Sequence, residues 1–436
     1  MEWWVILIIL AGLLTVLLLS GIPVAFAFLV LNIIGFAVWV GGTDGLKLLV
    51  PSAYDSIAVF TWIAVPLFIF MGELLFQTGI AKLLVDGVAK WIGRVPGSLS
   101  LVGITSGTLF AMMSGSGISG VALFGSTLAP EMKSRGYSKQ MTYGPLLAAG
   151  GLAVIIPPST LIVVVATLSV QSVGHLLIAG IIPGFILAVL YAVYILVRGR
   201  LQPHLAPAFI GPSVTWSEKI KALIVISPLS SLIFLVLGLI FLGVATPSEA
   251  AALGASGAFI LTVAYRRMTW QALKRTLWAT TSVSVMVFII LMSAVAFSQL
   301  LAFTGVAREI GDLIVSLPLP PIFIVIAMQL SLIFMGMFIE SVPMVMISIP
   351  IFFPIIRALG FDPIWFGILM LVNMEMAAMS PPFGIYLFTL KGVIPEATMT
   401  DIYRAIIPMV LLVFLLLIIL LFFPPLATWL PGLMYG

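Results

Sequence analysis

The stretch Leu152–Thr160, LAVIIPPST, decides the fold because it places two consecutive prolines in the middle of an apolar segment. Proline has no amide hydrogen and clashes with the preceding helical turn, so Pro157 and Pro158 must break a helix and leave carbonyls without helical partners. The same pair recurs 224 residues later, at Pro381-Pro382. A repeated break of this kind predicts two structurally related halves.

Three further landmarks repeat at nearly the same distance. They are Pro23 and Pro247 (224 residues apart), Thr78-Gly79 and Thr304-Gly305 (226), and Pro183 and Pro408 (225). Residues 198–221 between the halves are rich in proline and charge, which is typical of an exposed linker. We therefore predict a first repeat over 1–197, a cytoplasmic linker over 198–221 and a second repeat over 222–436.

The composition is that of a membrane protein. The 436 residues are 62% hydrophobic and 8% charged, whereas an average soluble domain has about 25% charged residues. Apolar stretches of about twenty residues recur along the chain, and in hydrocarbon only helices satisfy all their own backbone hydrogen bonds. The sequence thus predicts an all-α polytopic protein in a lipid bilayer. The absence of cysteine excludes disulfides and thiolate metal sites.

Each half is predicted to contain one re-entrant helical hairpin and one broken helix. The hairpins cover about 98–130 and 320–356, because two full crossings would need about forty residues in each case. The broken helices cover about 139–169 and 363–391. Each half then has five transmembrane crossings, and an odd number inverts the second half relative to the first.

The distribution of basic residues agrees with this inverted topology. Lysine and arginine gather in cytoplasmic loops, and with an external N-terminus only Lys47, Arg308 and Arg357 of the 19 lie outside. Both termini are therefore predicted to be periplasmic, and the cations give no reason to expect nucleic acid. The amphipathic segments 79–93 and 305–317 are expected to lie along the interface as arms.

The hairpin tips and proline breaks are the candidate site. Ser114-Gly115-Ser116-Gly117 could offer hydroxyls and carbonyls to a cation, or could serve as a small-residue packing motif. The proline pairs could likewise be simple kinks. Since no lysine or arginine falls within the hairpins or breaks, a bound anion must rely on helix N-termini and hydroxyls. The predicted substrate-binding residues are Ser114, Gly115, Ser116, Pro158, Ser159, Glu340, Ser341 and Pro382.

Three carboxylates in apolar segments need separate interpretations. Glu340 at the second tip and Glu375 before the second break could have ion or proton roles, since intramembrane carboxylates are often functional. A structural hydrogen bond to the hairpin backbone is the alternative for both. Glu249 follows Thr246-Pro247-Ser248, and this order predicts a capping box at a helix start.

Six motifs together give the chain a family resemblance over essentially its whole length. They are SGIPVAFAF, MSGSG, IPPST, TPSEAAALG, GMFIE and NMEMAAMSPPFG. In this combination the chain resembles the large membrane subunit of tripartite ATP-independent periplasmic (TRAP) transporters. The resemblance implies a bacterial inner-membrane protein in which a fixed scaffold supports a moving domain that carries both hairpins, an elevator mechanism driven by a Na⁺ gradient.

The resemblance also implies partners and coupling ions. The partners are a small four-helix membrane subunit, a periplasmic substrate-binding protein and a small organic-anion substrate. Two or more Na⁺ ions are expected. The implied sodium ligands are Ser114, Gly117, Ala153, Ile156 and Pro157 in the first site, and Gly336, Ala377, Ser380 and the Pro381-Pro382 break in the second.

The chain departs from the family pattern at four of these positions. Gly117 replaces a second adjacent serine, Ala153 and Ala377 replace glycine, and Ser380 replaces threonine. The hydroxyl missing at Gly117 would have to come from Ser119 or from water.

Two other classes of function compete with this one. A single-component Na⁺:anion symporter of dicarboxylate type is the main alternative, and uptake without a binding protein would favour it. No HExxH, acidic metal cluster or serine with a nearby base is evident, so we do not expect an enzyme. The substrate stays open among sialic acids, C4-dicarboxylates, other carboxylates and sulfonates.

Overall fold

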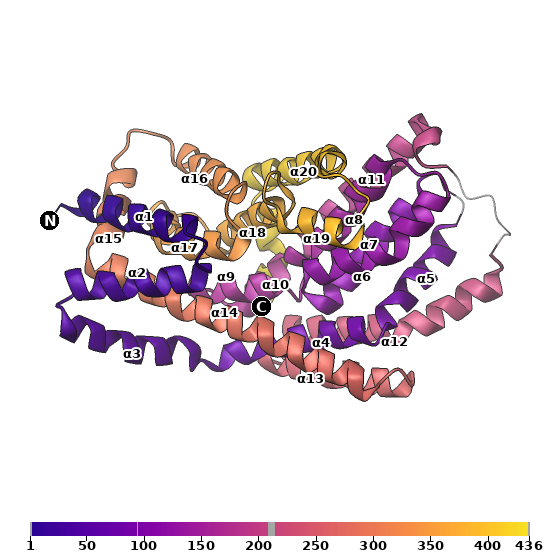
Figure 1. Cartoon of the computed structure of the whole chain (residues 1–436), viewed down its shortest axis with the longest axis horizontal. Helices are drawn as coiled ribbons and strands as arrows, with labels where there is room; N and C mark the ends of the chain where they lie inside the picture. Colours follow the sequence, from indigo (N-terminus) through magenta and orange to yellow (C-terminus); the bar gives the residue numbers. More distant parts are fainter. Residues whose placement is uncertain (1, 94, 208–213, 435–436) are drawn as a thin grey trace.

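The computed structural model describes residues 2–93, 95–207 and 214–434, and this part of the chain is helical throughout, with no strand (Figure 1). The α-helices of the first half are α1 (Trp3–Leu19), α2 (Val24–Trp39), α3 (Thr43–Ile57), α4 (Ala64–Gln77), α5 (Ile80–Ile92), α6 (Ser98–Ser114), α7 (Gly117–Ser134), α8 (Lys139–Gly151), α9 (Thr160–Leu168), α10 (Val173–Ala179) and α11 (Ile181–Leu201).

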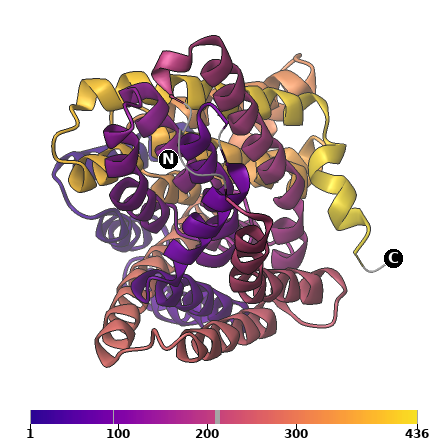
Figure 2. The ribbon, with the colours of Figure 1, turned by 90° about the vertical axis from the view of Figure 1, so that its right-hand side faces the viewer.

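The second half continues in the same all-helical manner. Its α-helices are α12 (Trp216–Phe241), α13 (Pro247–Ala264), α14 (Trp270–Phe303), α15 (Val306–Val315), α16 (Pro321–Gly336), α17 (Ser341–Ala358), α18 (Pro363–Met379), α19 (Ile385–Val393), α20 (Met399–Phe422) and α21 (Pro425–Gly432). Figure 2 shows α21 at the margin of the bundle, next to the C-terminus.

Seven stretches of the described residues are long and apolar enough to cross a membrane, and five further apolar helices are shorter. The shorter helices include α6, α16 and α18. These belong to the predicted hairpins and broken helix, but α17 (Ser341–Ala358), the other arm of the second predicted hairpin, is one of the seven stretches that are long enough to cross. The protein is therefore a multi-pass membrane protein, as the composition predicted.

The helices end where glycine and proline interrupt the apolar sequence. α6 and α7 are joined by Gly115 and Ser116 alone, and α8 ends at Gly151 before a 3-10 turn over Leu152–Val154. The chain then runs through the first proline pair to α9. In the second half α18 ends at Met379, and α19 begins only at Ile385, beyond the second proline pair.

The two pieces that precede the proline breaks form the centre of the molecule. Every residue of α8 from Met141 to Gly151 and of α18 from Trp365 to Met379 is buried. The indole nitrogen Nε1 of Trp365 donates to the carbonyl of Leu420 on α20 at 2.8 Å. A helix that is buried on all sides can hold its broken end in a fixed position, which is what a binding site requires.

The two halves of the chain are interleaved rather than separate. In Figure 1 the N-terminal helices α1 to α3 lie beside α14, α15 and α17 of the second half. Asn32 on α2 donates through Nδ2 to the carbonyl of Ser293 on α14 at 2.8 Å, and the rings of Phe28 and Phe297 meet edge to face at 5.2 Å. Contacts of this kind join the halves into one core.

Some sequence predictions about local structure are confirmed and others need correction. Thr246 and Glu249 form the predicted capping box at the start of α13, and α5 and α15 form within the two amphipathic segments. The helix α3 was not predicted. The segment between the halves is shorter than the predicted linker of 198–221, because α11 continues to Leu201 and α12 begins at Trp216. Residues 208–213 of the linker lie outside the described residues.

Candidate substrate and cation site

The tip of the first hairpin rests on the first proline break. Gly115 has a left-handed backbone (φ 55°), and a Cβ atom there would lie 2.7 Å from the carbonyl oxygen of Pro158. The backbone N–H of Ser116 donates to Oγ of Ser114 at 3.3 Å. Only glycine permits both the turn and this close approach, so the sequence SGSG places the tip directly against the break.

The second hairpin meets the second broken helix in a similar way. A Cβ atom on Gly336 would lie 2.6 Å from Cβ of Ala377, so α16 and α18 are in close contact there. Ser341 donates through Oγ to the carbonyl of Met374 at 3.0 Å, and Ser380 donates through Oγ to the carbonyl of Met376 at 2.7 Å. The start of α17 is therefore anchored to α18 just before its break.

A cavity of about 150 Å³ lies between the hairpins and the breaks. Its lining includes the first two residues of four helices: Gly117 and Ile118 of α7, Thr160 and Leu161 of α9, Ser341 and Val342 of α17, and Ile385 and Tyr386 of α19. Each helix N-terminus carries a partial positive charge and unpaired N–H groups. Four of them on one cavity create a place for an anion without a basic side chain.

The opposite wall of the cavity comes from α4 and α14. Ile69 and Glu73 of α4 and Val283, Met286 and Val287 of α14 line it. Oγ of Ser119 on α7 donates to Oε1 of Glu73 at 2.9 Å. One turn of α4 thus holds the first hairpin through a carboxylate.

Glu73 was missed at the sequence level, although a signal was present. It is the only charged residue in the apolar segment 56–77, and an intramembrane carboxylate is by itself a reason to expect function. Tyr386 and Thr160 were also missed. Each lies a few residues beyond its proline pair, where the sequence pattern does not indicate which side chains face the cavity.

The structure brings six of the predicted site residues to the cavity. They are Gly115, Ser116, Gly117, Ala153, Glu340 and Ser341. The other predicted residues do not line it: Ser114, Ile156, Pro157, Pro158, Ser159, Gly336, Ala377, Ser380 and Pro382. Ser159 is fully buried, and its hydroxyl donates to the carbonyl of Val154 at 2.8 Å. Its side chain therefore closes the first break rather than facing the cavity.

The first break offers oxygen atoms suited to a hard cation. Ile156 and Pro157 lie outside any helix, and their carbonyls accept no backbone hydrogen bond from the described residues. Carbonyl and hydroxyl oxygens are the ligands of Na⁺-type sites in broken membrane helices. The free carbonyl oxygens at this break are suitable ligands for such an ion.

Glu375 lies apart from the cavity. It is fully buried, and the Tyr191 hydroxyl donates to its Oε1 at 3.2 Å. The sequence allowed an ion or proton role for Glu375, or a structural hydrogen bond to the hairpin backbone. The structure shows a hydrogen bond, but its donor is the side chain of Tyr191 on α11.

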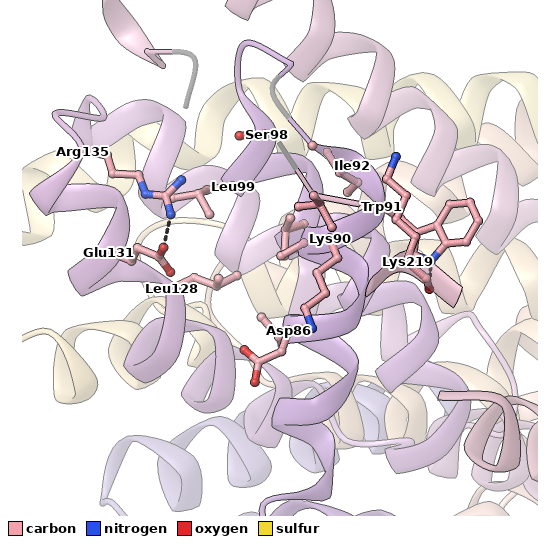
Figure 3. Close-up of a pocket in the computed structure, with 15 residues that line it drawn as sticks. Asp86, Lys90, Trp91, Ile92, Ser98, Leu99, Leu128, Glu131, Arg135 and Lys219 are labelled. Carbon is pink, nitrogen blue, oxygen red and sulfur yellow. Dashed lines mark hydrogen bonds and ion pairs between the residues drawn. The ribbon is translucent and has the colours of Figure 1, made fainter. Parts of the chain in front are cut away.

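A larger cavity of about 490 Å³ lies elsewhere, between α5, the first hairpin and the start of α12. Figure 3 shows its charged residues, with the ion pair of Arg135 and Glu131 on one side and Lys90 and Lys219 on the other. No hairpin tip or proline break lines it. Its size alone does not make it part of the candidate site.

The fold and the cavity define a class, the polytopic membrane proteins with broken helices. The YdaH transporter of Alcanivorax borkumensis has a similar fold, with a TM-score of 0.63, 14% sequence identity and coverage of 87% of this chain and 88% of that one.

The sequence comparisons identify the family. The profile of the tripartite ATP-independent periplasmic transporter, DctM component, matches residues 11–426. The chain is 32% identical to the C4-dicarboxylate TRAP transporter large permease protein DctM of Rhodobacter capsulatus, covering 98% of this chain and 99% of that protein. It is 30% identical to the protein of the same name in Vibrio cholerae, covering 96% of each.

This protein belongs to the DctM family of TRAP transporter large permeases. It is thus a transporter subunit rather than an enzyme, and its family serves secondary transport of organic acids within a tripartite system. Other relatives are named for ectoine, sialic acid and isethionate. The relatives therefore do not agree on one substrate.

Proposed function

We propose that this chain is the substrate-translocating subunit of a Na⁺-coupled, binding-protein-dependent importer of small organic anions in the bacterial inner membrane, with both termini periplasmic. The observation that carries the proposal is the cavity lined by the first residues of four helices. Helix N-termini bind carboxylates and similar anions through their N–H groups and dipoles. A small four-helix membrane subunit and a periplasmic binding protein complete the transporter.

The position of the cavity supports an elevator mechanism. One wall consists of hairpins and broken helices, which are anchored to each other by short contacts such as Gly115 to Pro158. The other wall consists of α4 and α14, and among the described residues one side-chain hydrogen bond crosses this boundary, from Ser119 to Glu73. We infer that the hairpins of two inverted repeats move as one body against α4 and α14, and that this movement exchanges the hydrogen bond and the packing of Gly72 against Ser114.

The charge around the cavity supports coupling to cations. A helix N-terminus carries about +0.5 of an elementary charge, so four carry about +2. Glu73 and Glu340 also line the cavity, and when ionised they cancel that charge. Among the described residues, no lysine, arginine or histidine lines it. An anion therefore gains little from the protein alone, and Na⁺ bound at the breaks supplies the missing positive charge.

The cavity volume favours a small substrate. The cavity measures about 150 Å³, whereas pockets for drug-sized ligands measure about 300–1,000 Å³. We infer that the substrate is a short carboxylate or sulfonate rather than a large sugar acid.

The test is uptake of short radiolabelled acids into proteoliposomes that contain this chain and its small subunit. Uptake is measured with and without the binding protein, and with an inward gradient of Na⁺ or of K⁺. The proposal expects uptake only when Na⁺ and the binding protein are both present. Uptake by this chain alone would instead make it a single-component symporter, and uptake in K⁺ would overturn the sodium coupling.

A further inference from the structure

The hydroxyl groups around the cavity differ in whether their hydrogen is already used. Four hydroxyl side chains line it, those of Ser116, Thr160, Ser341 and Tyr386. Ser341 donates to the carbonyl of Met374, and Ser116 donates to Oγ of Ser119 at 3.1 Å. Among the described residues, the hydroxyls of Thr160 and Tyr386 make no hydrogen bond. An anion in the cavity can therefore receive an O–H donor from these two side chains without breaking an existing bond.

Tyr386 reaches the tip of the first hairpin because residue 117 has no side chain. Tyr386 is the second residue of α19 and is 5% exposed. A Cβ atom on Gly117 would lie 1.9 Å from the Tyr386 hydroxyl oxygen and 2.4 Å from Cζ. A side chain at 117 and the phenol of Tyr386 thus compete for one space. The hydroxyl absent from residue 117 is replaced, at the start of α7, by a hydroxyl from the second half of the chain.

We propose that Tyr386 is a specificity-determining residue of the transport site, whose hydroxyl at the start of α7 donates a hydrogen bond to an oxyanion of the substrate. This inference rests on the proposed function and adds one donor to it. The phenolic O–H is neutral, so it recognises the oxyanion by geometry and leaves the charge of the site unchanged. The same geometry gives the small size of Gly117 a role, because the phenol occupies the space that a side chain there would need.

The first test compares Tyr386→Phe with Tyr194→Phe as a matched control. Tyr194 lies on α11, outside the cavity lining, and makes no hydrogen bond with the described residues. Binding of a short acid to the purified protein in Na⁺, uptake in the complete transporter, and thermal unfolding are measured for both variants. A hydrogen bond to a charged group is worth about 1.5–3 kcal/mol, so Tyr386→Phe should weaken acid binding about 10- to 100-fold with little change in unfolding temperature.

Specificity provides a readout that a merely structural role would not change. The wild type should prefer an acid over its neutral amide, and Tyr386→Phe should reduce that preference, because the bond that the phenol donates to a charged oxyanion is stronger than the bond that it donates to an amide carbonyl. Equal loss for acid and amide would overturn the inference, as would acid binding in Tyr386→Phe equal to that in the control. If the wild type binds and transports the acid and Tyr386→Phe does so equally well, only this inference is refuted. If the wild type neither binds nor transports any acid, the proposed function is refuted as well.

A second pair of variants uses the shared space at residue 117. Gly117→Ser alone should impair binding because its Cβ collides with the phenol of Tyr386. Tyr386→Phe keeps the ring and would not remove this collision, so the partner substitution is Tyr386→Ala. Gly117→Ser combined with Tyr386→Ala should bind better than either single variant, since the serine hydroxyl then has the vacated space. Absence of this mutual rescue would show that the two positions do not share one functional hydroxyl.

Discussion

Gly72 on α4 packs directly against Ser114 at the tip of the first hairpin. A Cβ atom there would lie 2.3 Å from Cα, 2.6 Å from the carbonyl oxygen and 2.8 Å from the carbonyl carbon of Ser114. Ordinary contacts begin at 3.4 Å, so Gly72→Ala must displace backbone by about 1.1 Å. Overpacking of this kind costs about 1–3 kcal/mol, and contact with backbone favours the upper end. The helix-propensity gain of alanine offsets about 1 kcal/mol, which leaves a net loss of about 2 kcal/mol.

Gly238→Ala in α12 is the matched control, because nothing lies within 4 Å of the Cβ position there. The control should be neutral or stabilised by up to about 1 kcal/mol. Thermal unfolding of the purified variants and Na⁺-driven uptake test the comparison, with the ten tryptophans as the fluorescent reporter. If Gly72→Ala unfolds at the same temperature and transports as well as Gly238→Ala, then the contact between α4 and the hairpin tip is not as described.

Two further substitutions probe single hydrogen bonds. Ser119→Ala removes the hydrogen bond to Glu73 across the cavity wall and should alter the balance between the inward-facing and outward-facing orientations of the transporter. The balance is measured by labelling single cysteines introduced into this chain, which has no cysteine of its own. Unchanged labelling would count against a moving boundary there. Thr246→Ala removes the N-cap of α13 and should lower the unfolding free energy by about 1 kcal/mol without changing substrate affinity; a change in affinity would contradict a purely structural role.

The sequence predicted the proline breaks well because proline acts locally. A missing amide hydrogen interrupts a helix whatever surrounds it, and both proline pairs lie between helices in the structure. The helix α3 was missed for the opposite reason. Residues 43–57 include Asp44, Lys47, Pro51 and Asp55, so their hydropathy does not indicate a membrane helix. The 226-residue register could have found it, since the unbroken α14 (Trp270–Phe303) corresponds to residues 44–77.

The site was only half predictable. Residues at the tips and breaks could be named, because glycine and proline fix where the backbone must turn. The sequence could not show that Ser159 turns inward to Val154, or that Tyr386 occupies the space beside Gly117. The first fact depends on the path of the backbone through the proline break, and the second on the contact between α7 and α19, which are more than 250 residues apart in the chain. From the sequence, Gly117 indicates only a missing hydroxyl, whereas in the structure it leaves room for the phenol of Tyr386.

The carboxylate of Glu340 gives the coupling argument its sharpest consequence. Glu340 lies at the N-cap of α17 without a side-chain capping bond, and it faces the same cavity as the four helix N-termini. If its negative charge is what prevents an anion from binding without Na⁺, then Glu340→Gln should bind the acid more tightly when Na⁺ is absent, because about +1 of helix charge is no longer cancelled. Acid binding is measured across a Na⁺ titration, with wild type as the reference. A Glu340→Gln variant that requires as much Na⁺ as the wild type would show that Glu340 holds the hairpin in place or binds the ion itself, and that the charge balance of the cavity does not set the coupling.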